Sequence, residues 1–471
     1  MVHLSVLTSN EIEAIHLATL RILGETGAVL THPEGREILA GAGASIQGER
    51  VRLPPQLVEA MVARCPSRVS LRGRSGATLV LGDGSLHWHN MGGARQVYDL
   101  RSDERRPATL QDVKDSARLL DALGGATTLT PFFTPCDVPG ELMSLVMYCH
   151  SLSNTTKPLQ GPGVQTAKEV EYAVRMAGVI GPPREVLTLS VSPVSPLTFP
   201  EHITAAIIAI ARAGIAFMPL PSPTAGTTAP LSLAGALAQQ NAELLASIVL
   251  AQLVQPGLPV IYCGRLAMME PRTGLSVWGG VELGLVSAAT VQIGHCYGLP
   301  VNVYGFSTNA HTLDIQNGSE RVLNAVLPAL AGADELSGIG QMEAGVMGSY
   351  AQMVIDSEIA DNVRRLRRGF EVNEDSLAVE VIASVMDGAH NFLGEKHTRR
   401  YLRAGEVLLT RLAERHSWEA WEAEGRLGMA EHAQAEAERL LAEYKVPPLS
   451  EEQEEELDEI IREAERRLLS R

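Results

Sequence analysis

Short apolar runs of strand length recur along most of the chain, and stretches rich in Ala and Leu, long enough for helices, separate them. The runs follow one another at intervals of about 30 to 45 residues. They begin at Leu86, Thr127, Pro158, Leu187, Ile215, Pro259, Val301 and Ala333. Strands that alternate with helices pair in parallel, so eight of them predict an α/β fold of the (β/α)8 TIM barrel type.

Two of the joins between helix and strand have nearly the same pattern. Gln255–Gly264 and Cys296–Gly305 each place a Gly-x-Pro turn before a β-branched and aromatic run, with a glycine after it. This is the pattern expected of an αβ loop and a strand exit. An open doubly wound sheet is the alternative, but Gly338-Ile339-Gly340 lacks the third glycine of a dinucleotide fingerprint.

The sequence patterns before and after the barrel region differ from the alternation of strands and helices within it. They predict that the chain is divided into three parts. Residues 1–80 are predicted to form an N-terminal accessory α+β segment, 81–370 the barrel, and 371–471 a helical C-terminal extension. In the first part, Asn10 and Glu13 predict the start of a helix over 12–26. In the last part, apolar residues at helical spacing form a stripe on an acidic helix: Leu457, Ile460, Ile461, Ala464 and Leu468. The stripe predicts one packed face, or pairing with another subunit.

The charge balance limits the partners. The chain has 39 Lys and Arg against 55 Asp and Glu, a formal net charge of −16. Nucleic acid and anionic membranes bind dense basic surfaces, so neither partner is expected. The five cysteines are scattered without a CxxC pair, and no uncharged run reaches the roughly 18 residues of a membrane span. These features predict a cytoplasmic protein without disulfides.

In barrels of this type the reacting groups follow the carboxyl ends of the strands. The chain has only 7 Phe, 4 Trp and 9 Tyr, yet several of these lie at predicted strand ends: Trp88, Phe132, Phe133, Tyr304 and Phe306. Quaternary ammonium groups cannot donate hydrogen bonds, and proteins hold them with aromatic faces and a nearby negative charge. An ammonium cage with Glu343 as its charge is therefore predicted, and core packing is the alternative for each ring.

A metal site is the competing interpretation. His87 and His89 stand at i and i+2 on one predicted strand, which places both rings on one face. Zinc needs three or more protein ligands, and the exits of strands five and six, at Pro219 and Cys263, offer no histidine. We therefore expect no metal bound by this chain. A metal-dependent TIM-barrel hydrolase remains an alternative function.

Several local motifs, in order and spacing, carry a resemblance along nearly the whole chain. They are residues 21–27, 92–94, 104–109, 154–158, 271–274, 330–334 and 391–398. With these motifs the chain resembles the trimethylamine methyltransferase (MttB-like) superfamily, whose members are (β/α)8 barrels. The resemblance implies a corrinoid-dependent methyltransferase. Such enzymes move a methyl group from a methylated amine to the Co(I) of a corrinoid (cobalamin) carried by a separate small corrinoid-binding protein.

The resemblance also bears on the substrate. The founding trimethylamine enzymes carry pyrrolysine, expected in the loop after strand seven, where this chain has standard residues over 306–313. Members without pyrrolysine include glycine betaine methyltransferase. A quaternary nitrogen leaves as a neutral amine without prior protonation, so a small quaternary amine of the betaine type is expected, with a tertiary amine as the lesser possibility. A non-catalytic betaine-binding relative is a further alternative. A homo-oligomer is expected.

On this picture the predicted site residues take three roles. Those expected to line the ammonium cage are Trp88, His89, Phe132, Phe133 and Phe306. Asn309 and Gln341, with His311, are expected to hydrogen-bond a substrate carboxylate. Glu343, against the cationic nitrogen, and His311 are the catalytic candidates. The alternative for Glu343 is a carboxylate at a helix N-terminus, and for His311 a loop histidine that supports another residue.

Overall fold

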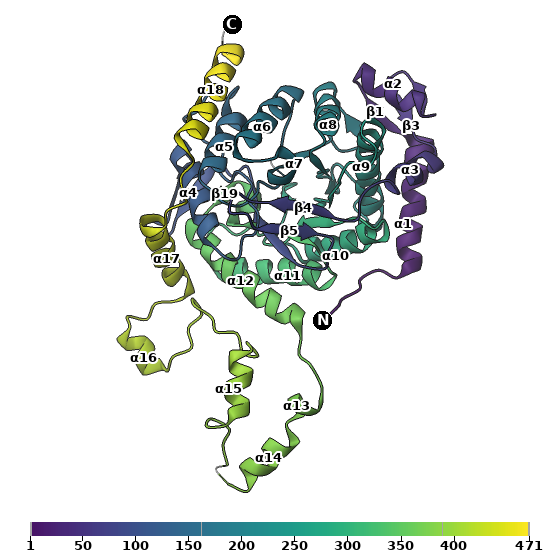
Figure 1. The fold of residues 1–471 in the computed structure, drawn as a ribbon. Coiled ribbons are helices and arrows are strands. Elements are labelled where there is room, and N and C mark those ends of the chain that lie inside the picture. The colour runs from purple at the N-terminus through teal and green to yellow at the C-terminus, as the bar shows by residue number, and fades with distance from the viewer. Residues whose placement is uncertain (1, 162, 389, 470–471) are drawn as a thin grey trace.

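The computed structural model describes residues 2–161, 163–388 and 390–469. Helices surround a set of short parallel strands, with an N-terminal unit on one side and C-terminal helices on the other (Figure 1). The α/β class predicted from the sequence is confirmed. No helix among these residues is both long enough and apolar enough to cross a bilayer.

The N-terminal unit combines short helices with small antiparallel sheets. Its elements are α1 (Ser9–Arg21), the π-helix η1 (Ile22–Thr26), β1 (Ala28–Leu30), α2 (Pro33–Gly41), β2 (Ser45–Gln47), β3 (Arg50–Arg52), α3 (Pro55–Val62), β4 (Val69–Arg72) and β5 (Thr78–Leu81). The first helix starts earlier than predicted, because Thr8 and Glu11 form a capping box and Asn10 lies inside the helix. The helical segment continues through η1 and stops at Gly27, whose φ of 73° suits glycine.

Six regular parallel strands appear within four residues of six predicted starts. They are β6 (His87–Asn90), β9 (Thr188–Val191), β11 (Ala216–Pro219), β13 (Tyr262–Cys263), β16 (Val301–Tyr304) and β17 (Glu335–Ile339). β17 lies between β16 and β6, β16 also pairs with β13, and β11 pairs with β9, all in parallel. The other two predicted strands, near Thr127 and Pro158, are irregular. Each contributes parallel bridges through a single residue, Leu129 or Leu159.

The two Gly-x-Pro turns form as predicted, one two residues before β13 and the other directly before β16. Gly257 and Gly298 adopt φ values of 80° and 69°, in the left-handed region that glycine enters without a steric penalty. Each turn reverses the chain from the end of a helix into a strand. This keeps the connection short and fixes where the strand begins.

Nine helices among the described residues accompany the strands. They are α4 (Leu110–Ala122), α5 (Met143–Ser153), α6 (Ala167–Ile180), α7 (Pro183–Val186), α8 (Glu201–Ala213), α9 (Leu233–Val254), α10 (Val281–Cys296), α11 (Ile315–Leu330) and α12 (Tyr350–Arg368). α9 packs against α1 and α3 of the N-terminal unit as well as α8. It is therefore buried on nearly all sides, which explains why its many apolar residues are not confined to one face.

Short strands and one 3-10 turn lie within the loops that connect these elements. They are β7 (Gln96–Asp99), β8 (Glu104–Pro107), β10 (Thr198–Phe199), β12 (Thr224–Ala225), β14 (Ala267–Met269), β15 (Ser276–Val277), β18 (Gln341–Met342), η2 (Glu343–Gly345) and β19 (Met347–Gly348). Several of them extend the loops that follow the parallel strands.

The C-terminal region is helical. It contains α13 (Glu374–Leu377), α14 (Val379–Met386), α15 (Lys396–Arg403), α16 (Trp418–Ala423), α17 (Met429–Glu443) and α18 (Glu451–Leu468). α17 packs on α12 and α4, whereas α13 to α15 project from the body (Figure 1). Three residues of the apolar stripe, Leu457, Ile460 and Ala464, are buried, and α18 packs on α5 and α6. The stripe thus faces its own chain.

A buried ion pair ties the loops after β16 and β17 to two helices. Arg321 of α11 lies 2.8 Å from Asp356 of α12, and both side chains are fully buried. Arg321 also donates to the carbonyl of Phe306, and Asp356 accepts from the backbone N–H of Gly340. The pair therefore fixes the exits of both strands.

Replacing Asp356 by Asn should lower the free energy of unfolding by about 3–5 kcal/mol, because Arg321 would keep an uncompensated buried charge. Urea denaturation measures this. Asp361→Asn, which breaks a partly exposed pair with Arg364 on the same helix, is the matched control and should cost less than about 1 kcal/mol. Equal losses for the two variants would contradict the role given to the buried pair.

Candidate active site

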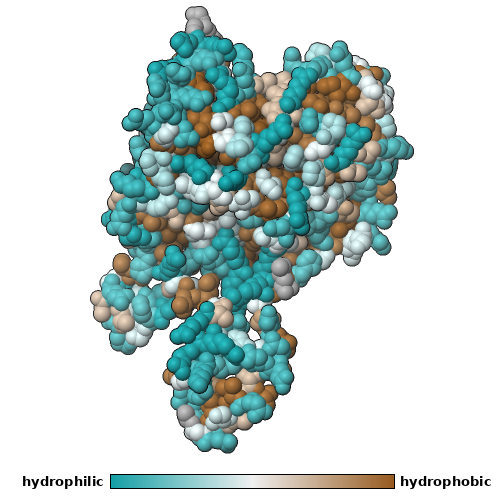
Figure 2. Space-filling model, in the orientation of Figure 1, coloured by the Kyte–Doolittle hydropathy of each residue, from teal (hydrophilic) through white to brown (hydrophobic). Residues whose placement is uncertain are grey.

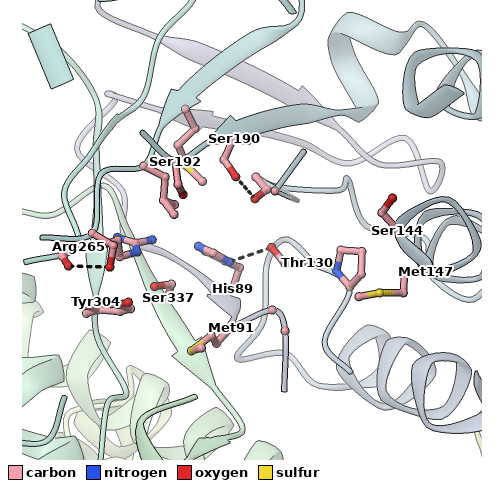
Figure 3. Close-up of a pocket in the computed structure, with 18 of the residues that line it drawn as sticks. His89, Met91, Thr130, Ser144, Met147, Ser190, Ser192, Arg265, Tyr304 and Ser337 are labelled. Carbon is pink, nitrogen blue, oxygen red and sulfur yellow. Dashed lines mark hydrogen bonds between the residues drawn. The ribbon is translucent and has the colours of Figure 1, made fainter. Parts of the chain in front are cut away.

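A cavity of about 440 Å³ opens at the carboxyl ends of the parallel strands. Its wall is built from small, hydroxylated and sulfur-containing side chains together with a few larger ones (Figure 3). The lining residues are His89, Met91, Gly92, Gly93, Thr130, Pro131, Ser144, Met147, Tyr148, Gly161, Gly163, Ser190, Ser192, Met218, Leu220, Ser222, Arg265, Trp278, Tyr304 and Ser337. Every one of the eight predicted strands or its exit contributes a residue. This volume is within the usual range for a small-molecule site.

His89 is fixed as a neutral imidazole. Its Nε2 lies 2.9 Å from the Nδ2 of Asn302, and its Nδ1 lies 3.3 Å from the hydroxyl of Thr130. An amide nitrogen can only donate, so Nε2 accepts and Nδ1 carries the proton. Burial and the nearby Arg265 cation lower the pKa of His89 to about 3.

The Asn302 side chain is oriented by Arg265 at its amide oxygen and by Glu335 at its amide nitrogen. Its Oδ1 accepts a hydrogen bond from Arg265, and its Nδ2 donates to Glu335 at 2.6 Å as well as to His89. Glu335 is fully buried and also accepts from Thr128 at 2.7 Å and Gln160 at 2.6 Å. Burial raises the pKa of Glu335, while these donors oppose that rise by stabilising the carboxylate.

Arg265 is the only charged side chain against the cavity among the described residues. It is 4% exposed, and its guanidinium stacks 4.8 Å from the ring centre of Tyr304. Its protein partners are carbonyl and amide oxygens, including the Asn302 carbonyl at 3.2 Å, and no described carboxylate forms an ion pair with it. Figure 3 shows the guanidinium directed toward the cavity beside His89. A buried cation without a counter-ion favours an anionic group of a ligand.

Aromatic and thioether groups supply the rest of the wall. Trp278 and Tyr304 lie with ring centres 4.8 Å apart, and Tyr148 is held by a hydrogen bond from its hydroxyl to the carbonyl of Gly163. Met91 and Met218 add polarizable sulfur atoms. Such a wall suits methyl groups around a cationic nitrogen.

Comparison with known proteins places the chain in a family. A family model described as trimethylamine methyltransferase (MTTB) matches residues 1–468. The trimethylamine methyltransferase MttB of Desulfitobacterium hafniense (strain DSM 10664 / DCB-2) is 31% identical over 467 residues, covering 97% of this chain and 93% of that protein. The chain belongs to the trimethylamine methyltransferase (MTTB) family. It is therefore a methyltransferase.

Two further relatives show the breadth of the MTTB family. The glycine betaine methyltransferase of Desulfitobacterium hafniense (strain Y51) is 31% identical over 470 residues, covering 97% of this chain and 96% of that protein. The MttB of Methanosarcina barkeri is 32% identical over 465 residues, covering 95% of this chain and 92% of that protein. The recognition made from the sequence motifs is confirmed.

Solved structures share the fold at low sequence identity. The hydroxylamine complex of MtmB has a TM-score of 0.51 and 11% identity, and the alignment covers 93% of this chain and 94% of that one. The Methanosarcina barkeri monomethylamine methyltransferase MtmB has a TM-score of 0.50, with the same identity and coverage. At this identity the likeness shows the α/β fold alone.

Of the nine side chains given roles from the sequence in this MTTB-family chain, His89 lines the cavity, and so does Tyr304, which was named with the aromatic residues of the cage. Trp88 stacks on Phe306 at 4.6 Å, and both are buried outside the cavity wall. Phe132 and Phe133 contact each other edge-to-face at 4.5 Å and are also buried. The four rings thus lie in the interior, where they support the strand ends.

Two of the remaining predicted residues connect loops. Asn309 accepts from the backbone N–H groups of Trp278 and Gly279 at 2.6 and 2.8 Å, so it positions the loop that carries Trp278. Gln341 exchanges two hydrogen bonds with the backbone of Thr308, each at 3.1 Å. Both therefore act on the loops around the cavity rather than on its lining.

Glu343 and His311 lie together at the surface. Glu343 pairs with Arg105 at 3.1 Å, and its oxygen lies 3.7 Å from the Nδ1 of His311, whose side chain is 72% exposed. Neither residue lines the cavity. Glu343 faces Arg105, and the His311 side chain faces solvent.

The competing metal interpretation depends on which donor groups are free. Both ring nitrogens of His89 are already bonded to Asn302 and Thr130. Among the described residues, one group of side chains is close enough to share a metal ion, Glu414, His416 and Glu424. Glu414 and His416 precede α16 and Glu424 follows it, and none of the three lines the cavity.

The sequence interpretation missed Arg265, Trp278 and the cavity methionines. Arg265 stands two residues after β13 and was visible as a charged residue at a strand exit. Trp278 lies on the loop between β15 and α10, where nothing in the local sequence indicates which way the ring points. Gly92 and Gly93, which carried the family resemblance, do line the cavity.

Because the native pKa of His89 lies below the ordinary value of about 6.5, the unfolded chain binds its proton first as the pH falls. His89 should therefore lower the free energy of unfolding between pH 6.5 and 5 by about 2 kcal/mol, at about 1.4 kcal/mol per pH unit. Urea denaturation of wild type and His89→Gln at several pH values measures the difference. Gln keeps an acceptor for Asn302 and should abolish this part of the pH dependence.

The exposed His311→Gln is the matched control and should follow the wild-type curve. If the His89→Gln and wild-type curves stay parallel from pH 7.5 to 5, the neutral, buried state assigned to His89 is wrong.

Proposed function

We propose that this MTTB-family chain moves a methyl group from a carboxylate-bearing quaternary amine to the Co(I) of a corrinoid on a separate small protein. The observation that carries the proposal is the buried Arg265 cation, which lacks a carboxylate partner among the described residues, beside a wall of aromatic and thioether groups. A betaine offers both complements, a carboxylate for the guanidinium and a methylated cation for the rings. One relative is named glycine betaine methyltransferase.

The protonation states around the cavity favour a quaternary over a tertiary amine. His89 is neutral, burial raises the pKa of Tyr148 well above its usual range, and no described carboxylate lines the cavity. A tertiary amine must gain a proton or another activating group before its methyl can leave. A quaternary amine leaves as a neutral tertiary amine, because its nitrogen takes the C–N bonding pair, and no proton has to move.

The corrinoid of the partner protein supplies the electron pair that takes the methyl group. The residues of this chain then have a positioning role. Arg265 would hold the carboxylate, and Trp278 and Tyr304 would lie against the methylated nitrogen. Fixing the methyl group in line with its acceptor replaces a random encounter and lowers the barrier through orientation.

We also propose that the eight strand segments close into a (β/α)8 barrel spanning residues 81–370, with 1–80 as an accessory segment and 371–471 as a helical extension. In support, parallel bridges join Leu129 to Leu159, Leu159 to Leu187 and Phe217 to Val260, between the regular pairs. The backbone N–H of Thr127 donates to the carbonyl of Trp88 at 2.8 Å. These contacts link each segment to the next one in the chain and the eighth to the first.

The two alternative functions, a metal-dependent TIM-barrel hydrolase and a non-catalytic betaine-binding protein, are not favoured. The curated relatives are named methyltransferases, and the cavity offers no set of three free metal ligands among its described residues. A non-catalytic betaine-binding relative would share this cavity, so turnover decides between the two. The cytoplasm as location and a homo-oligomeric state are part of the proposal.

Glycine betaine, proline betaine, carnitine and γ-butyrobetaine form a panel of carboxylate-bearing quaternary amines. At least one of them should methylate Co(I) cobalamin or the corrinoid protein, seen as the spectral change of the cobalt. Choline, which has the cation without the carboxylate, should be weaker in kcat/KM by about 10- to 100-fold, the usual effect of losing charged hydrogen bonds.

Inactivity with the whole panel, even with a matched corrinoid protein, would reject the betaine assignment. Tight betaine binding without turnover would instead support the non-catalytic alternative. If choline reacted as well as the carboxylates, the role of Arg265 would be contradicted while the methyltransferase assignment stood.

A further inference from the structure

Three consecutive residues adopt left-handed backbone conformations in the turn that joins β18 to β19. The φ values are 48° for Glu343, 48° for Ala344 and 86° for Gly345. Glycine enters this region without a steric penalty, but Glu343 and Ala344 do not, so the turn holds a strained backbone. Strain of this kind persists only where the surrounding structure imposes it, and such positions are concentrated at functional sites.

Hydrogen bonds from two neighbouring loops impose the shape of this turn. The backbone N–H of Ala344 donates at 2.9 Å to the carbonyl of Thr308, in the loop after β16. The carbonyl of Val346 accepts at 2.9 Å from the backbone N–H of Arg95, shortly after β6. Val346 also closes the turn, because its own N–H donates to the carbonyl of Glu343 at 3.1 Å. The turn is therefore fixed relative to the strand exits around the cavity.

Gly345 touches two side chains of the cavity wall without being part of the lining itself. A Cβ atom on Gly345 would lie 2.2 Å from Cε of Met91 and 2.9 Å from Cζ3 of Trp278. Carbon atoms pack at about 3.5 Å or more, so the wall would have to move by roughly 1 Å to admit a side chain here. Met91 and Trp278 thus occupy their places because residue 345 is glycine.

The backbone of Trp278 is held from a second direction by Asn309. The Asn309 side chain accepts from the N–H groups of Trp278 and Gly279, and it donates to the carbonyl of Ser276 at 3.1 Å. Because the backbone is fixed, the indole ring would have to rotate to make room for a side chain at position 345. The open space beside the ring is the cavity.

Trp278 and Met91 lie at the end of the strands from which a ligand enters. The opposite end is covered by β4 and β5 (Figure 1), and Gly82, which follows β5, donates at 3.1 Å to Asp334, just before β17. Figure 2 shows this covered end from outside, with side chains of mixed hydropathy packed over it. The room left by Trp278 and Met91 therefore limits the size of a group that the cavity can hold.

We propose that Gly345 is a specificity-determining residue. Its missing side chain sets how much room Trp278 and Met91 leave for the alkyl groups on a cationic nitrogen. The inference rests on the proposed function, because it takes the methylated nitrogen to lie against Trp278. Gly345 acts through these two neighbours and is a positioning residue for them. A wall displaced by roughly 1 Å would accept methyl groups and exclude larger ones, since a single methylene changes the fit of a tight apolar pocket.

Two probes that share one carboxylate test the proposal by titration calorimetry on the full chain. The first is whichever of the four betaines of the panel the wild type binds most tightly. The second is its analogue with ethyl in place of every methyl group on the nitrogen. Gly345→Ala should raise the ratio of the Kd of the ethyl analogue to the Kd of the methyl compound by at least about 10-fold. A general loss of structure would weaken both probes alike and leave this ratio unchanged.

Gly274→Ala is the matched control. Gly274 has a φ of 76° and lies between β14 and β15, in the same loop as Trp278, and a Cβ atom there would meet no atom within 4 Å. The variant should lower the urea midpoint through the same backbone strain as Gly345→Ala. It should leave the ratio of the two Kd values as in wild type.

Met91→Ala keeps the test independent of how well Gly345→Ala folds, because it removes the side chain nearest to the added Cβ. Alone, Met91→Ala should widen the wall and lower the ratio. In the Met91→Ala background, Gly345→Ala should change the ratio less than it does in wild type, since one of the two clashes is gone. Equal effects in the two backgrounds would contradict the positioning role.

A ratio that Gly345→Ala leaves unchanged, in a chain whose wild type binds a betaine, would overturn this inference and leave the proposed function standing. A wild type that binds none of the four betaines would reject the proposed function, and this inference with it.

Discussion

The amide of Asn302 holds together the groups that give the cavity its chemistry. It accepts from Arg265 and donates to both Glu335 and His89. Glu335 accepts from the amide nitrogen and Arg265 donates to the amide oxygen, so the amide can take only one orientation. Because the amide nitrogen then also donates to Nε2 of His89, the tautomer of His89 is fixed as well. Removing one member would leave a buried polar partner unpaired, which costs far more than an ordinary hydrogen bond contributes.

This arrangement places the neutral amide of Asn302 between the guanidinium of Arg265 and the carboxyl group of Glu335. Glu335 faces the interior and is satisfied by Thr128, Gln160 and Asn302, while Arg265 faces the cavity with hydrogen-bonding capacity to spare. Arg265 therefore makes the surface that a ligand meets positive. A zwitterion with a carboxylate and a methylated nitrogen matches such a wall better than a simple cation, because a simple cation would meet Arg265 without compensation.

The strand positions were accessible from the sequence because they depend on local pattern. Apolar runs between glycine turns predicted where β6, β16 and β17 begin. The same pattern predicted that a site would form at the carboxyl ends of the strands. The direction of individual side chains was not accessible. Trp88 and His89 are neighbours on β6, so they point to opposite faces, and only the pairing of β6 with β17 decides that His89 enters the cavity. Similarly, the stacking of Trp88 on Phe306 depends on segments over two hundred residues apart.

The central claim is that Arg265 recognises a carboxylate on a methylated cation. Calorimetric titration of wild type and Arg265→Gln with glycine betaine and with choline tests it most directly, with Arg272→Gln, an exposed arginine on a nearby turn, as the control. The account predicts that Arg265→Gln weakens glycine betaine binding by about 10- to 100-fold and does not weaken choline binding, because choline has no carboxylate for the guanidinium. Equal losses for both ligands, or no loss for glycine betaine, would contradict it.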